Sequence, residues 1–240
     1  MFIFLVAAFG AIVLAHTAPF PFLLDAIAPA PSLWHVSNQS GPPTVYLTFD
    51  DGPNPTTTPD LLDVLARERV PASFFLIDRN LTDETAPIVR RMFEEGHAVA
   101  LHSHTRALML MPPEQLAATL RAAADRITRL TGGTPCRVFR PHAGWRGGMM
   151  YAGLARGGYS LAGWGWMLWD WNWFRKRTAE SVVRRVVRRV SPGDIIVIHD
   201  GNEKHPRADR RYAVDATAEL IPALRARGFA FGRVCQPPNR

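Results

Sequence analysis

Residues 44–53 read TVYLTFDDGP, an apolar run followed by two adjacent carboxylates and a turn sequence. β-Branched and aromatic residues favour a buried strand, and Asp-Gly-Pro favours a turn where that strand ends. Two carboxylates this close can divide their roles, because one can bind a cation while the other accepts a proton. An Asx-type turn without any chemistry explains the same residues. On its own, the stretch favours neither interpretation of Asp50 and Asp51.

Six further strand-like runs follow, most of them separated by helix-like stretches. The strand-like runs are residues 73–77, 98–101, 137–139, 159–163, 195–198 and 229–234, and the helix-like stretches are residues 59–69, 83–95, 113–131, 179–190 and 213–227. Strands that alternate with helices predict an α/β fold with a parallel sheet of about seven strands.

Ionisable residues stand at the end of five of the seven strand-like runs or shortly after it. They are Asp50-Asp51, His102, Arg140, Asp170 and His199. A (β/α) barrel gathers its chemistry from the C-terminal ends of many strands, whereas an open doubly wound sheet concentrates it at one switch point. The pattern therefore predicts a barrel with its active site at the C-terminal strand ends.

His102-Ser103-His104 closes the third strand-like run. Histidine is the commonest metal-ligating side chain, and a strand-end histidine near paired carboxylates suggests zinc or a similar divalent ion. The alternative is a pair of hydrogen-bonded histidines at the entry to a loop.

Five short motifs resemble, in order, those of the polysaccharide deacetylases of carbohydrate esterase family 4, which share the nodulation-protein B homology domain. The motifs are Asp50-Asp51, His102-Ser103, Arg140-Pro141-x-x-Gly144, Asp170-Trp171 and Val197-x-His199. The resemblance covers roughly residues 44–235. It implies a distorted (β/α) barrel that removes acetyl groups from an N-acetylated glycan with the help of a divalent metal, for which zinc is the first choice.

The resemblance also implies a role for each matching residue. Asp50 is the expected base that activates the attacking water, and Asp51 and His102 are the expected metal ligands. Arg140 is expected to pair with Asp50, and His199 is expected to protonate the leaving amine.

Four further residues complete the site that the resemblance implies. Asp170 tunes the network of Arg140 and His199. The backbone N–H of Ala143 stands where the family has an oxyanion donor. Trp171 and Val197 line the pocket for the acetyl methyl group.

The sequence departs from the family pattern at three positions. Arg106 occupies the place of the second metal histidine, Met167 replaces a second acid, and His142-Ala143-Gly144 replaces the usual Pro-Tyr-Gly. Arg106 cannot serve as a ligand, because its guanidinium has no lone pair to give. We therefore expect a weaker or incomplete metal site.

Asp51 and His102 are the expected foundation of that metal site, and His104 is the nearest substitute for the missing third ligand. His142 and His205, on other loops, are further candidates. The replacement of a ligand also leaves a second functional class open, a catalytically weak or inactive barrel that binds an envelope glycan.

The apolar run at the N-terminus predicts a targeting segment ahead of the catalytic domain. Residues 1–15 are apolar and uncharged. As a helix they are too short to cross a bilayer core of about 30 Å, but their length suits the hydrophobic region of a secretory signal peptide. We expect residues 1–17 to be a signal peptide or membrane tether, residues 18–43 a connector and residues 44–240 the catalytic domain. An exported protein follows from this expectation, and a buried N-terminal helix is the alternative.

The net charge bears on whether the protein binds nucleic acid. The chain has 28 basic against 21 acidic residues, which gives a net charge of +7, but no nucleic-acid-binding motif accompanies the arginines. We therefore expect no nucleic-acid partner.

Cys136 and Cys235 lie in apolar runs and are expected to be buried thiols. An oxidising compartment leaves one disulfide as the alternative.

Overall fold

The computed structural model describes residues 4–10, 32–37, 41–165, 170 and 177–235. Its parallel strands form one sheet in the order β5-β4-β3-β2-β1-β6, and β7 pairs with the start of β1. The strands are β1 Thr44–Asp50, β2 Ser73–Ile77, β3 Ala98–His102, β4 Val138–Arg140, β5 Ser160–Leu161, β6 Ile195–His199 and β7 Ala230–Phe231. The predicted α/β fold with about seven parallel strands is confirmed.

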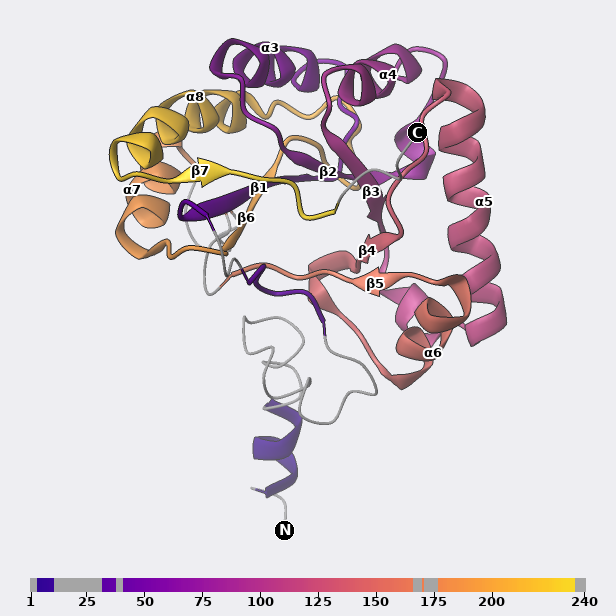
Figure 1. The fold of residues 1–240 in the computed structure, drawn as a ribbon. Helices are drawn as coiled ribbons and strands as arrows, with labels where there is room; N and C mark the ends of the chain where they lie inside the picture. Colours follow the sequence, from indigo (N-terminus) through magenta and orange to yellow (C-terminus); the bar gives the residue numbers. More distant parts are fainter. Residues whose placement is uncertain (1–3, 11–31, 38–40, 166–169, 171–176, 236–240) are drawn as a thin grey trace.

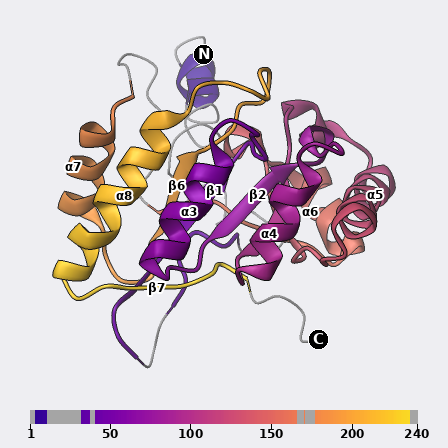
Figure 2. The same cartoon turned by 90° about the horizontal axis from the view of Figure 1, so that it is seen from above.

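Helices cover the outer face of this sheet (Figures 1 and 2). They are α3 Thr58–Glu68, α4 Ala86–Glu94, α5 Pro113–Thr131, α6 Gly148–Gly157, α7 Ala179–Arg189 and α8 Arg211–Ala226. Helix α6 was not expected, because its glycines lower helix propensity. Its packing on α5 explains one of them: a Cβ on Gly153 would stand 2.8 Å from the side chain of Leu116.

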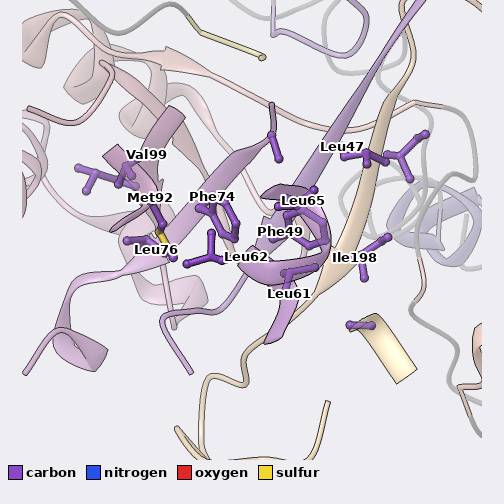
Figure 3. Close-up of a cluster of buried hydrophobic side chains, with 14 of the residues drawn as sticks. Leu47, Phe49, Leu61, Leu62, Leu65, Phe74, Leu76, Met92, Val99 and Ile198 are labelled. Carbon is purple, nitrogen blue, oxygen red and sulfur yellow. The ribbon is translucent and has the colours of Figure 1, made fainter. Parts of the chain in front are cut away.

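The strands alternate between two buried apolar faces, and the predicted site residues continue the inner one of the two. In β1, Leu47 and Phe49 point outward to α3, together with Phe74 of β2 and Ile198 of β6 (Figure 3). Because successive side chains of a strand point to opposite faces, Asp50 points to the inner face. The outer core thus fixes which residues enter the barrel.

An N-terminal segment bridges the two edges of the sheet, β5 and β6. Leu33 pairs with Ala162 just after β5, and His35 pairs with Asp194 just before β6. Between them, the buried Trp34 packs so closely on Gly163 that a Cβ there would stand 2.1 Å from its ring. This part of the expected connector therefore lies against the barrel.

Cys136 and Cys235 form a disulfide across 99 residues of sequence, with their Cα atoms 6.3 Å apart. The expectation of two buried thiols was wrong. One cysteine precedes β4 and the other follows β7, and the fold brings these two distant points together within the distance that a disulfide spans.

Residues 4–10 form a short helix that lies apart from the sheet (Figure 1). Its large apolar side chains face solvent, with Phe4 80% and Phe9 69% exposed. Within the residues described, no helix combines the length and apolar character needed to cross a bilayer.

Candidate active site

Strand register brings the predicted polar residues to one edge of the sheet. Asp50 at the end of β1 stands opposite His199 at the end of β6, and His102 of β3 stands opposite Arg140 of β4. All four side chains lie on the inner face, because they follow the same alternation as the apolar positions below them. Residues that are as many as 149 positions apart in sequence therefore meet at the barrel mouth.

Asp50 and Arg140 form a buried ion pair, with Nη1 of Arg140 2.5 Å from Oδ1 of Asp50. The guanidinium also donates to Oγ1 of Thr48 at 2.9 Å and to the carbonyl of Gly163 at 2.8 Å. Its Cζ lies 3.8 Å from the ring centre of Phe75. Burial lowers the pKa of Arg140, whereas Asp50 acts in the opposite direction. The pair holds the carboxylate of Asp50 in one orientation.

Asp51 and His102 face each other beside this pair. Oδ1 of Asp51 is buried, lies 3.3 Å from Nε2 of His102, and accepts no hydrogen bond from any described residue. On its other side, Nδ1 of His102 donates to the carbonyl of Arg140 at 2.7 Å. This bond leaves the lone pair of the neutral ring on Nε2, as in metal-ligating histidines.

The donor set of Asp51 and His102 fits a divalent cation. One carboxylate oxygen and one imidazole nitrogen are ligands that zinc accepts, and within the described residues the oxygen accepts no hydrogen bond. Burial opposes ionisation of Asp51, but His102 outweighs this effect and lowers the pKa of Asp51 to about 2. Across the described part of the chain, no group of three or more His, Cys, Asp or Glu side chains is arranged to hold an ion. A cation held by this pair would therefore need further ligands.

A second charged network surrounds His199. Oδ1 of Asp170 lies 2.6 Å from Nδ1 of His199, and Oδ2 accepts the backbone N–H of His199 at 2.8 Å. Tyr212 at the start of α8 donates to the same Oδ2 at 2.5 Å, and Arg177 donates to Tyr212 Oη at 3.3 Å. Burial lowers the pKa of His199, but Asp170 outweighs it and the pKa rises to about 9.

These groups open into a cavity of about 630 Å³. The residues that line it include Asp50, Asp51, His102, His104, Arg106, His142, Ala143, Arg177, Val197, His199, Lys204 and Arg210. Arg140 and Asp170 stand behind this wall and act on residues that reach the cavity. Two non-glycine residues at the site have left-handed backbone, Asp51 with φ 70° and Ala143 with φ 53°. Such strain is common at active sites.

The remaining predicted residues differ in their placement. Ala143 and Val197 line the cavity, as does the partly buried His104, whereas His205 is exposed and outside the lining. Trp171 lies outside the described residues. Arg106 extends over Trp145, with Cζ 5.6 Å from the ring centre.

Tyr212 and Arg177 were not predicted as part of the site. They reach Asp170 from α8 and from the chain ahead of α7. No local pattern in the sequence marks either residue, because their position depends on how α8 and the segment ahead of α7 pack. The raised pKa of Tyr212, caused first by burial and then by Asp170, keeps its hydroxyl protonated as a donor.

The chain is similar to known proteins over most of its length. A family model described as polysaccharide deacetylase matches residues 37–161. The chain is 35% identical over 201 residues to the chitooligosaccharide deacetylase of Bradyrhizobium sp. (strain ANU 289), an alignment that covers 79% of this chain and 88% of that protein.

Two solved structures show the same similarity in three dimensions. The Bc1960 peptidoglycan N-acetylglucosamine deacetylase is 25% identical, with a TM-score of 0.71, over 89% of this chain and 94% of that one. A family 4 acetyl xylan esterase from Clostridium thermocellum, in complex with a cobalt ion, is 30% identical, with a TM-score of 0.67, over 80% and 88%.

Proposed function

Because the chain belongs to the polysaccharide deacetylase family, we propose that it hydrolyses N-acetyl groups of a glycan that contains N-acetylglucosamine. This family membership confirms the resemblance of the five sequence motifs. The observation that carries the reaction is the meeting of Asp50, Asp51, His102 and His199 at one cavity. These residues provide a base, two metal ligands and an acid within one barrel mouth.

Asp50 is the base in this proposal. Its carboxylate lines the cavity and is held by Arg140 through Oδ1, which fixes its orientation at the place where water would be activated. A general base must lie within hydrogen-bond reach of the proton that it removes. The buried partners of Arg140 keep the pair from turning away.

Asp51 and His102 hold the divalent metal in this proposal. When bound, the metal supplies Lewis acidity toward the acetyl carbonyl and lowers the pKa of water. Two observations support the assignment. The buried Oδ1 of Asp51 accepts no hydrogen bond from the part of the chain that the structure describes, and the Arg140 carbonyl imposes the tautomer on His102.

His199 is the acid that protonates the leaving sugar amine. With its pKa raised to about 9, the ring carries the required proton throughout the neutral range. Asp170 holds the ring by Nδ1, so Nε2 is the nitrogen left to donate. The backbone N–H of Ala143 and the side chain of Val197, both at the cavity, are proposed to receive the acetyl group.

Release of acetate from N-acetylated chitooligosaccharides and from peptidoglycan tests the proposal. The chain should release acetate from at least one of them, and a chelator should abolish the release until zinc or cobalt is added back. An Asp50→Asn variant is the matched control for contaminating activity. Glycan binding without acetate release by the metal-loaded chain would instead support an inactive binding barrel.

We also propose that the protein is exported, either cleaved after residue 15 or tethered through the apolar N-terminus. The disulfide supports an oxidising compartment, and the exposed apolar side chains of residues 4–10 support a segment with a partner other than the barrel. Mass spectrometry of the mature N-terminus, with fractionation of membranes, tests this. Full-length chain recovered with reduced cysteines from the cytoplasm contradicts it.

A further inference from the structure

The proposed deacetylase has two metal ligands, Asp51 and His102, and needs a third, because catalytic zinc usually takes three protein ligands and an open position. Arg106, at the family position for that ligand, has no lone pair, and its guanidinium lies over the ring of Trp145. We infer that His142 is the third ligand. This inference rests on the proposed function and deepens it.

Hydrogen bonds pin the chain around His142 to the end of β3. The carbonyl of Arg140 accepts both Nδ1 of His102 at 2.7 Å and the backbone N–H of Ser103 at 3.3 Å. The backbone N–H of His142 in turn donates to Oγ of Ser103 at 2.8 Å. His142 is therefore fixed beside the residue whose Nε2 faces Asp51, although 40 positions separate the two histidines.

The ring of His142 lies close enough to the ring of His102 for a small movement to let both bind one ion. Its centre lies 6.4 Å from that of the His102 ring, and both line the same cavity. Two imidazoles on one tetrahedral zinc, with Zn–N of 2.0–2.1 Å, have ring centres about 5 Å apart. A rotation of the half-buried ring that closes roughly 1 Å would therefore bring the two ring centres to the spacing that one shared ion requires.

The donor atoms of His142 are available for this role. In the described part of the chain its hydrogen bond is made by the backbone N–H, and its ring makes none. Asp51 and His102 are among the charged neighbours of the His142 ring. The charged neighbours of His104 are Arg79, Asp78 and His102, and Asp51 is not among them. Geometry thus favours His142 over His104.

Cobalt binding by the full chain tests the inference without any substrate. After chelator treatment, Co²⁺ is titrated into the parent chain and into His142→Ala, His142→Phe and His104→Ala variants, with calorimetry and visible absorption as readouts. Both His142 variants should weaken binding by about tenfold or more, since even an outer-shell change costs about 10–100-fold. The matched control His104→Ala should bind like the parent. His142→Phe keeps a ring in the loop, and thermal unfolding checks each fold.

A second measurement uses the unaltered chain. Histidine modification by diethyl pyrocarbonate, read by mass spectrometry, should be blocked at His142 by zinc, while His104 and the exposed His205 still react. Loss of cobalt affinity in His104→Ala but not in the His142 variants would overturn the inference, as would equal affinity in all variants or zinc protection that omits His142. Because both readouts record metal alone, they remain decisive even if no acetate is released.

Discussion

Oδ1 of Asp170 lies 2.6 Å from Nδ1 of His199, while the second oxygen accepts the backbone N–H of the same histidine. This double contact fixes the imidazole in position and in charge. Burial alone would lower the pKa of His199, but the carboxylate raises it to about 9. The same attraction overcomes burial in Asp170 and holds its pKa well below the usual range. The pair is thus an imidazolium and a carboxylate at neutral pH.

The pH dependence of activity should follow this pair. His199 must be protonated to act as the acid, so activity should fall as the pH rises through about 9. In Asp170→Asn the largest attraction that offsets burial is lost, so the alkaline limb should move to lower pH. Profiles of kcat/KM measure the shift, with the exposed Glu180→Gln as control. An alkaline limb that stays in place would separate His199 from the acid role.

The free energy of unfolding should respond with the same sign. The folded pKa of His199 is raised above its ordinary 6.5, so this stabilisation is fully present below pH 6.5 and is lost as the pH rises through about 9. Urea unfolding of the parent and of Asp170→Asn across this range measures it. Parallel pH curves for the two chains would contradict the linkage.

Tyr212→Phe should reduce kcat by about 2–10-fold, the range expected for one hydrogen bond. The hydroxyl donates to Asp170 and so holds the carboxylate that holds His199. As a positioning residue, Tyr212 should leave KM nearly unchanged, and its loss should not move the alkaline limb downward as loss of the Asp170 charge does. Tyr159→Phe is the matched control, because its buried hydroxyl bonds only to the Leu120 carbonyl among described residues. Equal effects of the two variants would leave Tyr212 with a merely structural role.

Asp50→Asn should lower the rate of acetate release by about 10²–10⁴-fold, as expected when a general base is lost. The fold should survive, because Arg140 keeps its bonds to Thr48 and Gly163 and its contact with Phe75. Circular dichroism and thermal unfolding check the fold, and acetate release measures the loss. A folded Asp50→Asn chain with parental activity would exclude Asp50 from the mechanism.

The location of the site could be predicted from the sequence, because strand ends and strand alternation are local patterns. Asp50, His102, Arg140 and His199 each follow an apolar run, and parallel pairing brings such ends to one edge. Residues that approach from helices carry no such pattern. Tyr212 lies 42 positions from Asp170 and meets it only after α8 has packed against the sheet.

The cysteine pairing was missed for a related reason. Apolar surroundings made both residues resemble buried thiols, and only the fold places the start of β4 beside the end of β7. The prolines and polar residues of the N-terminal segment predict a connector and give no sign of a strand. Its contacts, two isolated bridges and one buried indole, depend on sheet edges that are distant in sequence.

Loss of the disulfide should lower the free energy of unfolding. A Cys136→Ser/Cys235→Ser chain should be less stable by about 2–4 kcal/mol, because the bond closes a long loop in the unfolded state. Urea unfolding with and without reductant measures this. Reductant should destabilise the parent and leave the double variant unchanged. Equal sensitivity of both chains would show that the bond is absent in solution.

Trp34→Ala should destabilise the barrel and disturb the site as well. The ring is 9% exposed and fills the space between β5 and β6, so its removal should cost about 3–5 kcal/mol in free energy of unfolding. It also lies 4.6 Å from Cζ of the buried Arg146, whose Nη1 donates to the carbonyl of Gly144 at 3.0 Å.

That chain of contacts ends in the turn that presents Ala143, so Trp34→Ala should lower kcat even at temperatures where the variant stays folded. Urea unfolding and acetate release measured on the same sample separate the two effects. His35→Ala, which removes a neighbouring side chain bonded to the Pro192 carbonyl, is the control for damage to the segment in general. If it lowers kcat as much as Trp34→Ala does, the effect comes from the bridge between the sheet edges and not from contact with Arg146.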